Sequence, residues 1–103
     1  MYRVSVLYGI PTDEAAFTDY YLTTHAPIAK RLKGIIGYNL TWIDRSENEG
    51  IPGIFLIADL YASDRAAMDA IMASPEGQAA TADVGNFATG GAYVLFGDEH
   101  AVE

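Results

Sequence analysis

Two segments of this chain are apolar at both odd and even positions, and they constrain its fold more than any other feature. They are IFLIADLY at 54–61 and AYVLFG at 92–97. An antiparallel sheet with one face in water carries polar side chains at alternate positions, so these strands are predicted to be covered on both faces. Asp59 lies within the first segment, where an unpaired carboxylate would be costly. We therefore expect Asp59 to face a polar pocket or to have a partner.

The other segments alternate between strand and helix patterns. Strand composition is found in YRVSVLYG at 2–9 and GYNLTWIDR at 37–45. Helices are predicted in three places: from an N-cap at Thr12 to the basic residues before Gly34, over 65–73 after Ser63-Asp64, and from Ser74-Pro75 to Gly85. The polar stretch 46–53 is predicted to be a hairpin loop.

This order, βαββαβ, predicts an α+β protein of the ferredoxin-like type, with a four-stranded antiparallel sheet and both helical regions on one face. The 103 residues fit a single domain, 1–103. The face without helices would expose more apolar surface than a monomer usually does. We therefore expect a homodimer that forms through this sheet face.

Composition argues against several kinds of partner and cofactor. The formal net charge of -8 disfavours nucleic acid and anionic membranes, and no segment has the length of a membrane span or the pattern of a signal peptide. A cytoplasmic location is therefore expected. The chain has no cysteine and two histidines, and no redox cofactor motif is visible. We therefore expect no metal and no cofactor.

His25 stands two residues before Pro27 in the first predicted helix. Proline removes one helical hydrogen bond and disfavours helical angles at the residue before it, so a break is predicted at Ala26. A carbonyl group freed by the break could fix one ring nitrogen of His25, which would leave the other as a base or acid in a cavity. Steps of 100° place His25 on the flank of the buried stripe. The alternative is a histidine at the edge of the core with backbone partners.

Three stretches together resemble the EthD family of the dimeric α+β barrel superfamily. They are VSVLYG, YYLTTHAPIAKRLKGIIGY and MASPEGQAATADVGNFATGG, and the similarity spans nearly the whole chain. The resemblance implies a ferredoxin-like protomer, sheet-to-sheet homodimers and a pocket between sheet and helices. The superfamily includes lactone isomerases, polyketide cyclases and cofactor-free monooxygenases, and the fold does not choose among these activities.

Two functional hypotheses follow. The first is a cofactor-independent enzyme that moves a proton on a small hydrophobic, aromatic or lactone-like metabolite, and the second is a binding or accessory protein without chemistry. The candidate catalytic residues are His25, Tyr38 and Asp59. The candidate substrate-binding residues are Tyr21, Phe55, Asp83 and Phe87.

Three of these candidates also have structural interpretations. The phenol ring of Tyr38 could simply pack in the strand, with its hydroxyl group in water. Asp59 could orient His25 or act as a base, or it could only make a hydrogen bond at the dimer interface. Asp83 lies near a helix end, where negative charge is unfavourable, so it is expected to have a specific partner or to cap the following turn.

Overall fold

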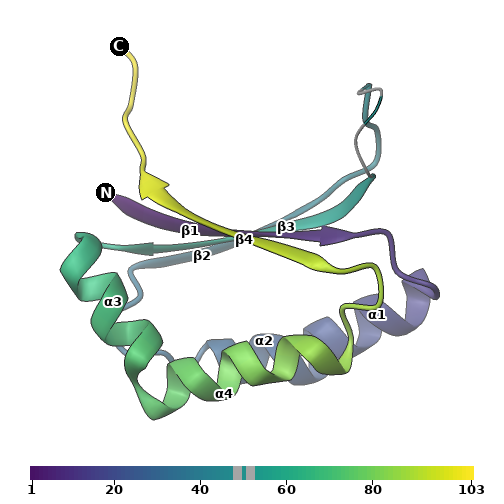
Figure 1. Ribbon diagram of the computed structural model, residues 1–103, viewed down its shortest axis with the longest axis horizontal. Coiled ribbons are helices and arrows are strands. Elements are labelled where there is room, and N and C mark those ends of the chain that lie inside the picture. Colours follow the sequence, from purple (N-terminus) through teal and green to yellow (C-terminus); the bar gives the residue numbers. More distant parts are fainter. Residues whose placement is uncertain (48–49, 51–52) are drawn as a thin grey trace.

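The computed structural model describes residues 1–47, 50 and 53–103 and contains one antiparallel sheet (Figure 1). Its strands, in the spatial order β2-β3-β1-β4, are β1 (Tyr2–Gly9), β2 (Gly37–Trp42), β3 (Ile54–Ala62) and β4 (Ala92–Asp98). The predicted α+β class and ferredoxin-like order are confirmed, and the strands lie where predicted except that the one expected over 37–45 ends at Trp42. The loop predicted at 46–53 lies partly outside the described residues.

The helices all lie on one side of the sheet (Figure 1). They are α1 (Glu14–Tyr20), the π-helix η1 (Tyr21–His25), α2 (Ala26–Ala29), α3 (Arg65–Ala73), α4 (Pro75–Asp83) and the 3₁₀-helix η2 (Val84–Asn86). In the described part of the chain, none of them is long and apolar enough to cross a membrane.

Polar side chains cap the starts of these helices. Asp64 and Ser74 accept hydrogen bonds from backbone N–H groups of α3 and α4, as predicted. The prediction for α1 is wrong by one residue, because Asp13 is the N-cap and accepts from the N–H group of Ala16 at 3.0 Å. The N–H group of Thr12 instead donates to Oγ1 of Thr89 at 3.0 Å. This bond ties the start of α1 to the segment before β4.

The first helical region passes through Pro27 without the predicted break. Ala26 has helical angles, with φ -58° and ψ -43°, and its N–H group bonds to the carbonyl group of Tyr21, five residues earlier. This wider π turn comes directly before α2, so Pro27 occupies the first turn of a new helical segment. Proline is tolerated there because the first turn does not need its N–H group.

The π turn also changes which residues face the sheet. Phe17, Tyr21, His25 and Ala29 are all buried, at intervals of four residues. In a regular α-helix, four residues turn through about 400°, so such a stripe would drift by about 40° at each step. The wide turn offsets part of this drift. The predicted flank position of His25 is therefore wrong, since only 5% of the residue is exposed.

Helices α3 and α4 meet in a close contact at Gly77. A Cβ atom at this position would lie 2.3 Å from the carbonyl oxygen of Ile71 and 2.7 Å from that of Met72. These are backbone atoms, which cannot rotate away as a side chain can. The absence of a side chain at Gly77 therefore lets α4 start against the end of α3.

Two hydrophobic clusters fill the layer between sheet and helices. The first contains Leu32, Leu60, Met68, Ile71 and Ala80, and the second contains Tyr8, Phe17, Tyr21, Leu56 and Phe87, among other residues. Both clusters include alanines that line one space between sheet and helices: Ala29 and Ala80 belong to the first, and Ala58 to the second. These small side chains leave space between the clusters, and this space is the candidate site.

Candidate functional site

A cavity of about 310 Å³ lies between the sheet and the helices, where the two clusters meet. This volume is at the lower end of the range for small-molecule sites. Its apolar walls come from both layers and include Val4, Val6, Ala29, Leu32, Ala58, Leu60, Met72, Ala80, Val84, Val94 and Phe96. Its polar lining residues are Tyr8, Tyr21, His25, Tyr38 and Thr81. The predicted pocket position and three predicted residues of the site, Tyr21, His25 and Tyr38, therefore coincide with this cavity.

His25 is fixed by a carboxylate. Its Nδ1 atom lies 2.9 Å from Oδ2 of Asp83, and both side chains are buried. An ionised carboxylate can only accept a hydrogen bond, so Nδ1 carries the proton and donates it. The predicted backbone carbonyl partner is therefore wrong, whereas the expectation that Asp83 has a specific partner is confirmed.

Asp83 is held by two further donors. The hydroxyl group of Tyr20 donates to its Oδ1 atom at 2.7 Å, and the side-chain amide of Asn86 donates to the same oxygen at 3.0 Å. Burial alone would raise the pKa of Asp83, but these bonds and the bond from His25 outweigh burial and lower the pKa. Asp83 is therefore ionised at neutral pH and directs one ring nitrogen of His25.

Burial lowers the pKa of His25 below its ordinary value, and the contact with Asp83 only partly opposes this shift. The imidazole is therefore neutral at pH 7. Among the described residues, none bonds to its Nε2 atom. Every fully buried side-chain nitrogen or oxygen atom in that part of the chain has a partner, so Nε2 is not fully buried. Nε2 therefore keeps a free electron pair, and His25 is one of the residues that line the cavity, so this nitrogen is the one available to accept a proton there.

Tyrosine hydroxyl groups form the second polar feature of the cavity. The hydroxyl oxygens of Tyr21 and Tyr38 lie 2.6 Å apart, and the hydroxyl group of Tyr8 interacts with that of Tyr21. Burial raises the pKa of each of these three phenols. They therefore stay protonated near neutral pH and can donate hydrogen bonds.

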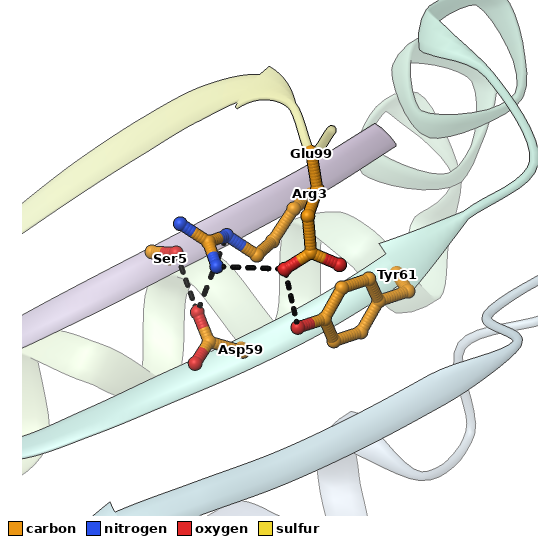
Figure 2. Close-up of polar contacts among 5 residues, drawn as sticks. All are labelled: Arg3, Ser5, Asp59, Tyr61 and Glu99. Carbon is orange, nitrogen blue, oxygen red and sulfur yellow. Dashed lines mark hydrogen bonds and ion pairs between the residues drawn. The ribbon is translucent and has the colours of Figure 1, made fainter. Parts of the chain in front are cut away.

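Asp59 lies on the other face of the sheet, so the predicted pairing with His25 is wrong (Figure 2). Its Oδ1 atom accepts a hydrogen bond from Ser5 at 2.5 Å and lies 3.7 Å from Nε of Arg3. Arg3 also donates to Glu99 at 3.0 Å. The physical reason for the error is that strand 54–61 is apolar on both faces, so its pattern does not reveal which residues face the helices. The expectation of a polar partner for Asp59 is confirmed.

Three of the predicted substrate-binding residues do not line the cavity, namely Phe55, Asp83 and Phe87. Phe87 packs on the ring of His25, with centroids 4.7 Å apart, and Phe55 packs on Phe17 at 5.3 Å. Both phenylalanines therefore pack outside the cavity lining, and Asp83 affects the cavity through its bond to His25. Tyr21 lines the cavity as predicted.

The sequence interpretation missed Tyr8, Tyr20 and Asn86. Tyr8 faces the helices from β1, and the alternation of that strand was the available signal for its burial. Tyr20 reaches Asp83 from 63 residues away, which no local pattern specifies, whereas Asn86 lies three residues after Asp83, so this spacing was an available local signal.

Within the described residues, no group of three His, Asp or Glu side chains could hold a metal ion. The polar groups that face the cavity are those of a base and of hydrogen-bond donors. This arrangement is suited to proton transfer on a bound molecule.

Sequence comparison identifies proteins related to this chain. Residues 11–91 match the EthD domain. A Rhodococcus erythropolis protein, described as an uncharacterized 11.0 kDa protein in the thcB-thcC intergenic region, is 38% identical over 102 residues, which cover 99% of this chain and 98% of that protein.

Solved structures agree with this assignment. An EthD family protein from Bacillus halodurans superposes with a TM-score of 0.88 and is 28% identical, covering 97% of this chain and 99% of the other. An antibiotic biosynthesis monooxygenase has the same fold, with a TM-score of 0.62 and 18% identity, covering 98% and 100%. The match over residues 11–91 and the Rhodococcus relative show the family: this chain belongs to the EthD family.

Proposed function

We propose that this protein binds a small, neutral, largely apolar carbonyl compound in the cavity and moves a proton on it, with His25 as the base and without a cofactor. The observation that carries the proposal is the His25–Asp83 pair. One ring nitrogen is fixed by a buried carboxylate at 2.9 Å, and the other is free, in a side chain that lines an apolar cavity.

The proton transfer uses groups already in place. Nε2 of His25 accepts a proton from the carbon beside the carbonyl group. The electron pair of the broken C–H bond forms a C=C bond to the carbonyl carbon, and the π pair of the C=O bond moves onto the oxygen. Asp83 stabilises the imidazolium ion that forms, and a tyrosine hydroxyl group donates to the developing oxyanion. Return of the proton to another atom of the same molecule completes an isomerisation.

Charge and size support a neutral, small ligand. Among the described residues that line the cavity, none is lysine or arginine, and the chain carries a formal charge of -8. An anionic ligand would therefore lose its hydration without gaining a cationic partner. The same fold is used by an antibiotic biosynthesis monooxygenase, which supports only the capacity of this scaffold to house an enzyme.

We also propose that the protein is a homodimer that forms through the sheet face without helices. Tyr93 and Leu95 on this face are 57% and 54% exposed, and both pair with residues of the central strand β1. Arg3 lies beside Asp59 and Glu99 on the same face, so opposite charges are available to a second copy of the same surface. Such a face is large and apolar for a monomer. A cytoplasmic location remains a prediction from the sequence.

Deuterium exchange tests the proposed chemistry without knowledge of the natural substrate. The protein is incubated in D₂O with neutral enolisable ketones, cyclohexanone and 2-tetralone, and exchange at the carbon beside the carbonyl group is followed by NMR. We expect the wild-type protein to accelerate exchange and His25→Gln to give the uncatalysed rate. If both proteins leave the uncatalysed rate unchanged, catalysis is wrong for these ketones and the alternative, a binding protein without chemistry, is favoured.

A further inference from the structure

The lining of the cavity combines a hydroxyl cluster with apolar walls. The hydroxyl groups of Tyr21 and Tyr38 bond to each other at 2.6 Å, with Tyr8 beside them. Residues of the first hydrophobic cluster, among them Leu32, Leu60 and Ala80, line the same cavity. A ligand that fills this space therefore needs an oxygen atom for the hydroxyl groups and an apolar group for the walls.

The hydroxyl groups of Tyr21 and Tyr38 can together donate one hydrogen bond to another group. Its two hydroxyl groups carry two protons, and the bond between them uses one of these. The raised pKa values of both phenols keep both protons in place. The remaining proton can be donated in a hydrogen bond to Tyr8 or to an oxygen of the ligand, and the Tyr8 hydroxyl group is itself a further donor. The cluster therefore presents a hydrogen-bond donor in an apolar setting, where such a bond counts for most.

Small side chains keep the apolar part of the cavity open. Ala29 from α2 and Ala80 from α4 both line the cavity and are buried to 5% and 8% exposure. A larger residue at either position would project into the space instead of into solvent. The neighbouring Ala79 is exposed on the same helix, so it offers a matched position where the same substitution leaves the cavity unchanged.

We propose that the tyrosine hydroxyl cluster of Tyr8, Tyr21 and Tyr38 binds the oxygen of a neutral, single-ring ligand, and that Ala80 determines how long its apolar substituent can be. The ligand class is thus a cyclic ketone, enol or phenol with a short uncharged alkyl group. This inference rests on the proposed function only for the choice of the cavity as the binding site. It concerns orientation and specificity, and His25 is not part of it.

Calorimetric titration with 4-ethylphenol, phenol, ethylbenzene and benzoate tests the inference on the full chain. For the wild-type protein we expect 4-ethylphenol to bind about tenfold more tightly than ethylbenzene, because only the phenol accepts a hydrogen bond from the tyrosines. Benzoate should not bind, because its charge has no partner in the cavity. Equal affinity for 4-ethylphenol and ethylbenzene would overturn the proposal.

Single substitutions test the hydroxyl cluster and the apolar lining separately. Tyr38→Phe should lower the affinity for 4-ethylphenol about tenfold and leave that for ethylbenzene unchanged, while Tyr93→Phe on the other sheet face should change neither. Tyr21→Phe provides the same test if Tyr38→Phe does not fold. A variant that keeps full affinity for 4-ethylphenol would show that the oxygen is bound elsewhere.

Ala80→Leu should lower the affinity for 4-ethylphenol at least about tenfold and change that for phenol less than about twofold. Ala79→Leu should alter neither affinity. Equal losses for both phenols would show that Ala80 does not limit the substituent. A wild-type protein that prefers 4-ethylphenol to ethylbenzene but leaves ketone exchange at the uncatalysed rate would support this inference and overturn the proposed function. Accelerated exchange with equal affinity for the two ligands would do the reverse, so each can fail without the other.

Discussion

Nδ1 of His25 and Oδ2 of Asp83 lie 2.9 Å apart inside the protein, although 58 residues separate them in the chain. The carboxylate receives two other hydrogen bonds, so it stays ionised and leaves the imidazole one orientation. The consequence is a neutral base with a free nitrogen, in a residue that lines an apolar cavity.

Asp83→Asn is expected to slow ketone exchange roughly tenfold or more. The amide keeps the size of the carboxylate and can still bond to the ring, but it no longer stabilises the imidazolium ion. The rate is measured by NMR with 2-tetralone in D₂O. Asp69→Asn, on the exposed face of α3, is the control and should exchange the ketone at the wild-type rate. An unchanged rate in Asp83→Asn would show that the pair is structural.

Stability is expected to fall as the pH is lowered from 7 to 5.5. The pKa of His25 is lowered in the folded protein, so the unfolded chain binds a proton more readily once the pH approaches the ordinary value of 6.5. This contribution is present above pH 6.5 and is lost toward the lower pKa of the folded state. Urea unfolding at several pH values measures it, and His25→Gln should show a smaller dependence.

A proton-NMR titration gives the direction of this shift directly. The chain has a second histidine, His100, in the exposed C-terminal segment, and His100→Gln removes its signal. The remaining imidazole signal should titrate below the ordinary pKa of histidine, because burial disfavours the charged form. A pKa above 6.5 would mean that Asp83 outweighs burial, and a pKa above 7 would mean in addition that the resting base is protonated at neutral pH.

Gly77→Ala is expected to destabilise the protein by about 1–3 kcal/mol or more, because the added methyl group meets backbone carbonyl oxygens of α3. Gly85→Ala is the matched control, since a Cβ atom there has no neighbour within 4 Å. Urea unfolding of both variants provides the comparison. Equal stability of the two variants would show that α4 can shift away from α3 at little cost.

Sedimentation is expected to give twice the chain mass of 11.1 kDa. Leu95→Glu should produce a monomer, because it places a charge on the apolar sheet face proposed as the interface. Leu22→Glu changes a leucine of similar exposure in the helical layer, 51% against 54%, and should remain dimeric. A wild-type monomer at micromolar concentration would contradict the proposed interface.

The elements of this fold are largely predictable because their signals are local. Asp64 and Ser74 cap α3 and α4 through bonds to residues three positions ahead, and strand composition identifies β1 and β4. The end of the first helical region is an exception: α2 ends at Ala29, before the basic residues predicted to close it, and Gly34 with a φ of 96° lies in the turn that follows.

The site was only partly predictable because its decisive contacts are distant in sequence or depend on irregular backbone. His25 and Tyr38 were identified, but regular 100° steps could not reveal the π turn that brings His25 inward. Asp59 was assigned to the wrong face because both parities of its strand are apolar. The pairing of His25 with Asp83 depends on the packing of α4 beside η1, which neither segment specifies alone.

The π turn at Tyr21–His25 holds one residue more than an α-helical turn of the same rise would need. Leu22, within it, is 51% exposed, so the surplus residue can be lost without emptying the core. After such a deletion the helix could close regularly while the segments before and after kept their places. Tyr21 and the imidazole would then be three residues apart, about 60° around the helix axis. The presence of one exposed residue in the π turn thus sets the angle about the helix axis between the side chains of Tyr21 and His25.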